Sequence, residues 1–330
     1  MKAVVLHSYG DVDVLELVDV AEPVPGPEEV LVEVVATALN RADLLQRRGL
    51  YPSPALAGFT PPAPEIPGME FAGRVAGAGE RVTSWSVGDE VMGIVGGGAY
   101  AERLVTHEHQ LLRIPDGVSV ADAAAIPEVA ITAFDALVVQ GGLTPGRTAL
   151  VHAGASGVGT AAVQLCKAIG ARVIVTASAS KLDACRSLGA DLAIDYATQD
   201  FVAECASFTH GVGVDVVLDV IGGNYVDKNI ASVRVGGHIV QVGTMGGGRT
   251  EVNIGMMLPK RASLTGTVLR ARPLAEKIAI TQRFASEVLP LYDSGSIRPV
   301  IDSRYRLSAI ADAHAYMETN ANVGKILIDV

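Results

Sequence analysis

The chain has 330 residues, a mean hydropathy of +0.34 and a formal net charge of −10 at pH 7. That length is enough for two domains with separate hydrophobic cores. The acidic balance disfavours nucleic acid and anionic membranes as main partners. No apolar run approaches the length of a membrane span, and the apolar start Met1–Leu6 turns polar too soon for a signal peptide. We therefore expect a cytoplasmic protein.

Residues 1 to about 122 show short apolar or alternating runs separated by proline and glycine, which predict a small barrel of β-strands. Two segments interrupt the runs. Asn40–Gly49 predicts a short helix, and the proline-rich stretch Tyr51–Pro67 predicts a loop, which at that length is usually functional or mobile. The predicted strands are Ala3–Leu6, Val14–Val20, Val30–Leu39, Phe71–Ala76, Glu90–Ile94 and Tyr100–Val105.

A glycine-rich turn follows, where the apolar strand Ala149–Val151 runs into small residues and opens a helix over Val158–Ile169. Gly154, Ser156 and Gly159 take the three positions of a G-x-G-x-x-G pattern, with serine in place of the middle glycine. Small residues there let a pyrophosphate reach the backbone N–H groups at the start of the helix. Taken alone, the turn also fits a tight strand-to-helix connection.

The context of the turn favours the dinucleotide, because apolar strands continue to alternate with helices. We predict a doubly wound parallel sheet over residues 123–265. Arg261–Val268 is its expected edge strand, and pairing of this edge with a twin predicts a homodimer. The other strands are Ala171–Thr176, Leu192–Ile194, Val214–Val220 and His238–Gly243, and the helices are Lys181–Leu188, Phe201–Phe208 and Tyr225–Ser232.

The C-terminal residues 266–330 are expected to return to the first domain, which is then discontinuous and comprises residues 1–122 and 266–330. They hold predicted helices at Ala275–Tyr292 and Leu307–Asn320 and predicted strands at Ile297–Val300 and Lys325–Ile328. The three cysteines, Cys166, Cys185 and Cys205, fall on predicted helices at spacings that match no metal or redox motif. We read them as buried or half-buried thiols.

Several segments together resemble the medium-chain dehydrogenase/reductase superfamily, in its zinc-free, zeta-crystallin-like quinone oxidoreductase branch. The resemblance implies an α/β fold, with a doubly wound parallel Rossmann sheet and a discontinuous GroES-like β-barrel domain for the substrate. The segments are Asn40–Asp43, Gly49–Pro52, Ile66–Gly73, Ala125–Glu128, His152–Gly159, Ile221–Gly223, Met245–Gly248 and Asn322–Lys325.

Metal is not expected. Asn40 stands where zinc dehydrogenases of this superfamily carry a cysteine ligand, and Met69 stands where they carry a histidine. Neither side chain replaces a thiolate or an imidazole on zinc. Residues 1–165 also contain no cysteine for a structural zinc.

The cofactor is predicted to be NADPH. An NAD site places an acid after the second strand of the sheet, but this chain reads Thr176–Lys181 without one. The Ser178 hydroxyl and the Lys181 ammonium suit a 2′-phosphate, and the resemblance adds Tyr196. Lys181 also fits a solvated lysine at a helix start.

The resemblance places further residues near the nicotinamide, in a cleft between the two domains. Among them, Asn322 equally fits a turn residue at a hairpin corner. The full predicted cofactor set is Asn40, Thr132, Gly154, Ser156, Gly157, Val158, Ser178, Lys181, Tyr196, Gly222, Gly223, Val242, Gly243, Met245, Gly246, Val268, Leu269 and Asn322.

Three residues are catalytic candidates: Tyr51, Asn40 and Asp43. The Tyr51 phenol is placed to donate to a carbonyl that gains negative charge as hydride arrives, although an aromatic residue beside a proline-rich loop as often packs. Asp43 is expected to orient water or a neighbouring residue. His152 lies on a buried strand and is predicted to be a core histidine with satisfied hydrogen bonds.

The predicted function is NADPH-dependent, metal-free hydride transfer to quinones or similar conjugated carbonyls, which are small molecules. One alternative is C=C reduction in an enal or enoyl thioester, whose phosphates would need basic residues. Arg47, Arg48, Arg270 and Arg272 are available for that role. The other alternative is a non-catalytic NADPH-binding protein with a structural or regulatory role.

Overall fold

The computed structural model describes residues 1–51 and 65–330. Most of the loop predicted at Tyr51–Pro67 therefore lies outside the described residues. The chain forms two compact units. The first comprises Met1–Ile131, Leu269–Ser294 and Pro299–Val330, and the second comprises Thr132–Val268 and Gly295–Arg298. The predicted domains place the boundaries at residues 122 and 266 and assign residues 295–298 to the first domain.

The second unit is built on six parallel strands in the order β10-β9-β8-β11-β12-β13. The order reverses between β8 and β11, which is the switch point where doubly wound sheets bind ligands beyond their carboxyl ends. The strands are β8 (Thr148–Val151), β9 (Arg172–Ala177), β10 (Leu192–Asp195), β11 (Val214–Asp219), β12 (Val233–Gln241) and β13 (Ser263–Gly266).

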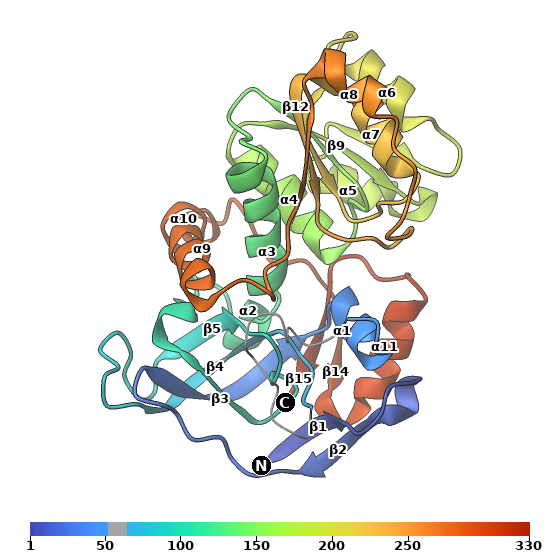
Figure 1. Cartoon of the computed structure of the whole chain (residues 1–330). Coiled ribbons are helices and arrows are strands. Elements are labelled where there is room, and N and C mark those ends of the chain that lie inside the picture. Colours follow the sequence, from blue (N-terminus) through green and yellow to red (C-terminus); the bar gives the residue numbers. More distant parts are fainter. Residues whose placement is uncertain (52–64) are drawn as a thin grey trace. The chain divides into compact units, whose positions relative to one another are not determined.

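Helices cover both faces of this sheet, with α4 to one side and α6 and α7 to the other (Figure 1). The doubly wound parallel sheet and its edge strand are thus as predicted, because continuous Val- and Ile-rich strands need cover on both faces. The helices are the π-helical η4 (Asp135–Gln140), α4 (Gly157–Ala168), α5 (Leu182–Ser187), α6 (Phe201–Phe208), α7 (Tyr225–Ser232) and α8 (Ile254–Lys260), and α3 (Pro127–Phe134) runs from the first unit into the second.

Three details of the second unit differ from the prediction. Strand β12 starts at Val233 rather than His238, since Gly236 and Gly237 hid its first half in the sequence pattern. The helix predicted from Lys181 opens with a 3₁₀ turn, η5 (Ala179–Lys181). Helix α8 was not predicted, because Gly255 and Pro259 weaken its helical signal. The three cysteines lie on α4, α5 and α6 and are buried, as predicted.

The first unit holds a two-stranded sheet, β1-β2, and a seven-stranded sheet that follows the path β14-β15-β3-β4-β5-β7, with β6 also paired to β3. Because β15 pairs with β3, the two ends of the chain share one sheet. The strands are β1 (Lys2–Leu6), β2 (Leu15–Asp19), β3 (Glu29–Ala38), β4 (Glu70–Ala78), β5 (Glu90–Ile94), β6 (Arg103–His107), β7 (Leu111–Arg113), β14 (Ile301–Arg306) and β15 (Lys325–Asp329).

The C-terminal prediction is wrong in two places. The strand expected at Ile297–Val300 is instead β14, where half-buried and exposed residues alternate and pair in parallel with β15. The helix expected at Ala275–Tyr292 is broken at Val288, because Pro290 has no N–H to continue the hydrogen bonds of the first helix and lies in the first turn of a second one. The helices of this unit are α1 (Arg41–Arg47), α2 (Val120–Ala123), α9 (Leu274–Glu287), α10 (Leu289–Asp293) and α11 (Ile310–Glu318), with the 3₁₀ turn η6 (Leu307–Ala309) before α11.

Candidate active site

The glycine-rich turn joins β8 to α4 at the switch point of the parallel sheet. Ser156 caps α4, and its Oγ accepts a hydrogen bond from the Gly159 N–H at 3.1 Å. The N–H groups at the very start of a helix, here those of Gly157 and Val158, have no partner within the helix. They and the positive end of the helix dipole suit a pyrophosphate.

Two glycines let the turn pack tightly. A Cβ at Gly154 would lie 2.5 Å from Cβ of Val175 on β9. A Cβ at Gly159 would lie 2.3 Å from the Ala153 carbonyl oxygen and 2.6 Å from the Gly154 carbonyl carbon. Only glycine fits at these two positions, which is the role of the first and third glycines in a dinucleotide-binding turn. The middle position tolerates serine because its hydroxyl caps the helix.

The residues predicted to contact the 2′-phosphate follow two neighbouring strands. Ser178 comes directly after β9, and Lys181 ends the 3₁₀ turn η5 that starts there. Tyr196 comes directly after β10, which pairs with β9, and its side chain is exposed. The carboxyl ends of parallel strands share one edge of the sheet, so these residues gather at that edge, and no acid stands between Thr176 and Lys181.

A buried hydrogen-bond chain runs beneath this edge. His152 Nδ1 lies 2.9 Å from Thr176 Oγ1, and its Nε2 lies 2.8 Å from Asn229 Oδ1. Asn229 Nδ2 donates to Asp219 Oδ2 at 2.8 Å, so its Oδ1 is left to accept and His152 carries its proton on Nε2. Burial lowers the pKa of His152 and keeps the ring neutral. It is a core histidine with satisfied hydrogen bonds, as predicted.

The series of buried hydrogen bonds from His152 through Asn229 to Asp219 ends at the predicted cofactor glycines. Asp219 Oδ1 accepts from the N–H groups of Ile221 at 2.6 Å and Gly222 at 3.0 Å. Gly222 and Gly223 both have positive φ, +67° and +56°, which a residue with a Cβ seldom adopts. A Cβ at Gly223 would also lie 2.7 Å from the Gly246 carbonyl oxygen. Both glycines are therefore required by the backbone.

The loop after β12 packs against the same segment. Val242 N–H donates to the Asp219 carbonyl at 2.7 Å, Met245 N–H to the Val220 carbonyl at 3.1 Å, and Gly246 N–H to the Ile221 carbonyl at 2.7 Å. A Cβ at Gly243 would lie 3.1 Å from the Val220 carbonyl oxygen. The predicted residues 242–246 thus form one backbone-bonded layer with Gly222 and Gly223.

The remaining predicted cofactor residues divide between the units. Thr132 is buried on α3, and Val268 is 45% exposed after β13, both in the second unit. Leu269 and Asn322 belong to the first unit. Asn322 is buried, and its Nδ2 donates to the Gly324 carbonyl at 2.8 Å, which is the hydrogen bond expected of a turn residue.

In the first unit, Asn40 belongs to a buried ionic cluster that the sequence did not reveal. Lys325 Nζ lies 2.7 Å from Glu70 Oε1, 2.7 Å from Asn40 Oδ1 and 2.6 Å from the Leu39 carbonyl oxygen. Asn40 Nδ2 donates to Glu70 Oε1 at 2.9 Å, and Glu70 Oε2 accepts from the Glu128 N–H at 2.9 Å. The amide of Asn40 is therefore engaged within the protein, and both charges of the ion pair are buried.

This cluster does not fit a catalytic zinc. The Lys325 ammonium contacts Asn40 and Glu70 directly and would repel a second cation there. Met69, at the other expected ligand position, is a buried thioether. Within residues 1–51 and 65–330, no group of three or more histidine, cysteine, aspartate or glutamate side chains is arranged to hold a metal ion.

Asp43 lies in a second buried group, on α1. Its Oδ2 accepts from the Asn40 N–H at 2.8 Å and from the Tyr100 hydroxyl at 3.0 Å. Tyr100 OH also lies 3.4 Å from His314 Nε2. Burial raises the pKa of Asp43 to about 6, and burial lowers the pKa of His314 to about 3. His314 is thus neutral at pH 7.

Tyr51 contacts Arg270, one of the arginines available for the phosphates of an enoyl thioester. The Arg270 guanidinium carbon lies 5.1 Å from the centroid of the Tyr51 ring, and Arg270 Nη1 donates to the Tyr51 carbonyl at 3.4 Å. Burial raises the pKa of the Tyr51 phenol, while the nearby Arg270 charge lowers it. Tyr51 is half-buried in these contacts.

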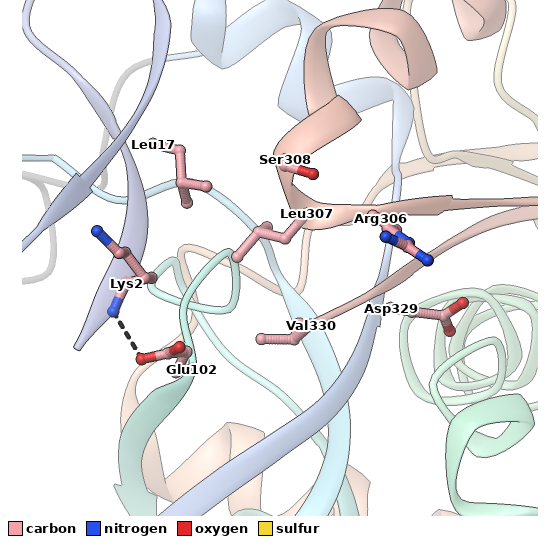
Figure 2. A pocket seen from close by; sticks show the side chains of 8 residues that line it. All are labelled: Lys2, Leu17, Glu102, Arg306, Leu307, Ser308, Asp329 and Val330. Atoms are coloured by element: carbon pink, nitrogen blue, oxygen red, sulfur yellow. Dashed lines mark hydrogen bonds between the residues drawn. The ribbon is translucent and has the colours of Figure 1, made fainter.

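A separate hollow on the first unit contains none of the predicted site residues (Figure 2). Its volume is about 340 Å³, and the Lys2 N–H donates to Glu102 Oε2 at its edge at 2.7 Å. The lining residues are Lys2, Leu17, Glu102, Arg306, Leu307, Ser308, Asp329 and Val330.

Sequence reasoning missed Glu70, Tyr100, Arg270 and Lys325 as members of the buried clusters. Glu70 and Lys325 lie inside quoted family segments, but a charge in a motif does not reveal its partner 255 positions along the chain. The one sequence signal for Glu70 and Lys325 is that each is a charged residue within an apolar β-strand, β4 and β15 respectively.

Two family models match the chain. One, described as alcohol dehydrogenase GroES-like domain, matches residues 26–116, and the other, described as zinc-binding dehydrogenase, matches residues 157–285. The GroES-like match falls in the first unit. The other match starts at Gly157, within the glycine-rich turn.

Curated relatives match over nearly the whole chain. A quinone oxidoreductase of Pseudomonas aeruginosa is 34% identical, with 99% of both chains covered. The chain belongs to the medium-chain dehydrogenase/reductase superfamily, in its zinc-free quinone oxidoreductase branch. The human synaptic vesicle membrane protein VAT-1 homolog is also 34% identical over 99% of this chain and 86% of its own length. The chloroplastic NADPH-dependent alkenal/one oxidoreductase of Arabidopsis thaliana is 33% identical, over 99% of this chain and 79% of its own.

Solved structures of the superfamily agree with this assignment. The quinone oxidoreductase of Pseudomonas syringae pv. Tomato DC3000 has a TM-score of 0.89 at 32% identity and covers 100% of this chain and 99% of its own. Mycobacterial Rv1454c complexed with NADPH has a TM-score of 0.88 at 29% identity, with 100% of both chains covered. This quinone oxidoreductase-type chain is therefore an oxidoreductase that uses a nicotinamide cofactor. Across the described ranges, no helix is both long and apolar enough to cross a membrane.

Proposed function

We propose that this chain is an NADPH-dependent reductase that transfers hydride to quinones or similar conjugated carbonyls without a metal. The observation that carries the proposal is the edge formed by β9 and β10. There Ser178, Lys181 and Tyr196 follow the strand ends, where an NAD-specific site would place a carboxylate. The relatives named for quinone and for alkenal/one reduction support the class of acceptor.

When bound, the reduced nicotinamide supplies the hydride. The turn from Gly154 to Val158 holds the pyrophosphate, and the layer around Gly222 and Gly243 lets the cofactor pass close to the backbone. Tyr51 donates a hydrogen bond to the acceptor carbonyl as its oxygen gains charge. One proton and two electrons reach the quinone together as hydride. The resulting hydroquinone anion takes its proton from water, so the protein mainly aligns and shields the reactants.

Replacing Lys181 with alanine is expected to raise the Michaelis constant for NADPH about tenfold or more and to leave that for NADH nearly unchanged. The reason is that the ammonium pairs with a 2′-phosphate that NADH lacks, and a charge-assisted contact is worth about 1.5–3 kcal/mol. Steady-state kinetics with each cofactor measures the effect. Lys167→Ala, which removes an exposed lysine paired with Asp191, is the control. Equal effects on both cofactors would refute the assignment.

Removing the phenolic hydroxyl with Tyr51→Phe is expected to lower turnover by no more than about tenfold, or ~1.4 kcal/mol of barrier. A hydroquinone anion is a weak base, so it needs little help with its proton. Turnover with a quinone at saturating NADPH tests this. A loss of about a thousandfold, or ~4 kcal/mol, with unchanged NADPH affinity would identify Tyr51 as a general acid and favour the enal or enoyl alternative.

The alternative of enal or enoyl-thioester reduction keeps the support of the alkenal/one relative. The arginines offered for a thioester substrate's phosphates are, however, largely engaged within the protein. Arg47 is fully buried and contacts Glu318, which also accepts from Arg48 at 2.7 Å. Arg270 donates to two backbone carbonyls. A non-catalytic role would show as absent NADPH oxidation in the same assays.

We propose that the chain forms a homodimer in the cytoplasm, through pairing of strand β13 with its twin. This strand is the edge of the parallel sheet, and Leu264 on it and Val268 just after it are 41% and 45% exposed. Sedimentation at micromolar concentration is expected to give twice the chain mass of 34.2 kDa. Leu264→Lys should shift the protein towards monomer. A wild-type protein that sediments only as monomer would contradict the proposal.

A further inference from the structure

Arg270 is a buried arginine whose guanidinium contacts other groups of the first unit. Its residue is 7% exposed, and its Nε donates to the Gly96 carbonyl at 2.7 Å. Its Nη1 donates to the Tyr51 carbonyl at 3.4 Å, and its guanidinium lies over the Tyr51 ring. The side chain thus joins two backbone segments and one aromatic ring of the first unit.

The planar guanidinium suits this combination of contacts. It stacks on an aromatic face while its N–H groups donate in the plane, which the compact ammonium of a lysine cannot do. Holding both the ring and the carbonyl of one tyrosine limits the rotation of its side chain and the movement of its main chain. A Tyr51 side chain held in one orientation helps to align the acceptor with the cofactor.

The groups around Arg270 change its pKa in both directions. Asp43, Glu65 and the phenols of Tyr9 and Tyr51 face Arg270 and raise its pKa, while burial lowers it more. The Arg270 charge also contributes to a lowered pKa at Lys277.

The Tyr51 phenol is influenced by the same charge. Besides Arg270, the carboxylates of Glu128 and Asp43 face it and raise its pKa, and burial has the largest effect in that direction. Arg270 is the group that opposes them. It therefore acts on both the orientation and the proton affinity of this hydroxyl.

We propose that Arg270 is a positioning residue, which holds Tyr51 in place for the acceptor carbonyl and does not bind the phosphates of a substrate. This inference rests on the proposed function, because it takes Tyr51 as the side chain that meets the acceptor.

Kinetics with Arg270→Gln test the inference. We expect kcat/KM for a quinone to fall about tenfold, with the Michaelis constant for NADPH unchanged, because an alignment is lost and no cofactor contact is removed. Arg270→Lys should recover only part of the loss. In a Tyr51→Ala background, Arg270→Gln should cost nothing further. Arg283→Gln, which removes an exposed arginine of α9 paired with Glu287, is the control. An equal loss with and without Tyr51 would overturn the inference.

A second measurement needs no activity. In protein labelled with ¹³C in the tyrosine rings, the Tyr51 resonance is assigned by its absence in Tyr51→Phe. Arg270→Gln should move and broaden this resonance in the resting protein, and Arg283→Gln should not. An unmoved resonance would overturn the inference even if the enzyme reduces quinones. A wild-type chain that reduces no acceptor would instead overturn the proposed function, and the resonance would still decide whether Arg270 holds the ring.

Discussion

Lys325→Met is expected to lower the free energy of unfolding of the first unit by about 3–5 kcal/mol, because it leaves the Glu70 carboxylate buried without its partner. Lys325 and Glu70 are 4% and 0% exposed, and the lysine also donates to Leu39 and Asn40. Urea unfolding followed by Trp85 fluorescence measures the change. Trp85 is the single tryptophan and lies in the same unit, so the signal reports on that unit.

Two controls accompany this prediction. Lys2→Met breaks an ion pair with Asp19 that is also 2.7 Å long, but with both partners at least half exposed, and should leave the unfolding midpoint unchanged. Adding Glu70→Gln to Lys325→Met should recover part of the loss, since the neutral amide is cheaper to bury and still accepts from Glu128. If Lys325→Met were as mild as Lys2→Met, the buried cluster would not stabilise the fold as we argue.

Gly159→Ala is expected to weaken NADPH binding by about 100-fold, or ~2.7 kcal/mol. The new Cβ would lie 2.3 Å from the Ala153 carbonyl oxygen, and this contact is with backbone, so the start of α4 must move away from the turn. The N–H groups that we propose receive the pyrophosphate would move with it. Titration calorimetry with NADPH measures the dissociation constant, and circular dichroism checks the fold.

Gly77→Ala is the matched control for this substitution. Gly77 has no positive φ, and a Cβ there would meet Leu31 only at 3.7 Å, an ordinary contact. Binding should therefore match the wild type. A Gly159→Ala protein that binds NADPH within about twofold of the wild type, less than ~0.5 kcal/mol, would show that the turn does not hold the pyrophosphate.

The parallel sheet could be predicted because its evidence is local. Apolar strands alternate with helices, and the small residues Gly154, Ser156 and Gly159 of the turn lie within one short stretch of sequence. The strand at Ile301–Arg306 was missed for the opposite reason. Its polar, half-exposed residues become a strand only because β15 lies beside them, and this pairing partner is distant in the sequence.

In the candidate site too, local features could be predicted from the sequence and contacts between distant segments could not. The positions of Ser178 and Lys181 just after a strand could be predicted from the sequence, and their contact with a 2′-phosphate stays a prediction. Asn40 could not be read fully, because its amide is engaged by Glu70 and Lys325, which arrive from β4 and β15. Arg270 was read as a phosphate ligand, and its contact with Tyr51 emerged only from the fold. Burial and pairing of charges depend on tertiary structure, so sequence patterns do not show them.

The measurement that tests the account most directly is acceptor-dependent oxidation of NADPH by chelator-washed protein, with product analysis. The panel holds ortho-quinones, para-quinones, enals and enoyl thioesters, each assayed with NADPH and with NADH. We predict that quinones are reduced fastest, that one hydroquinone forms for each NADPH consumed, and that NADPH is strongly preferred. Turnover that requires added zinc, that prefers NADH, or that is confined to enals and enoyl thioesters would contradict it.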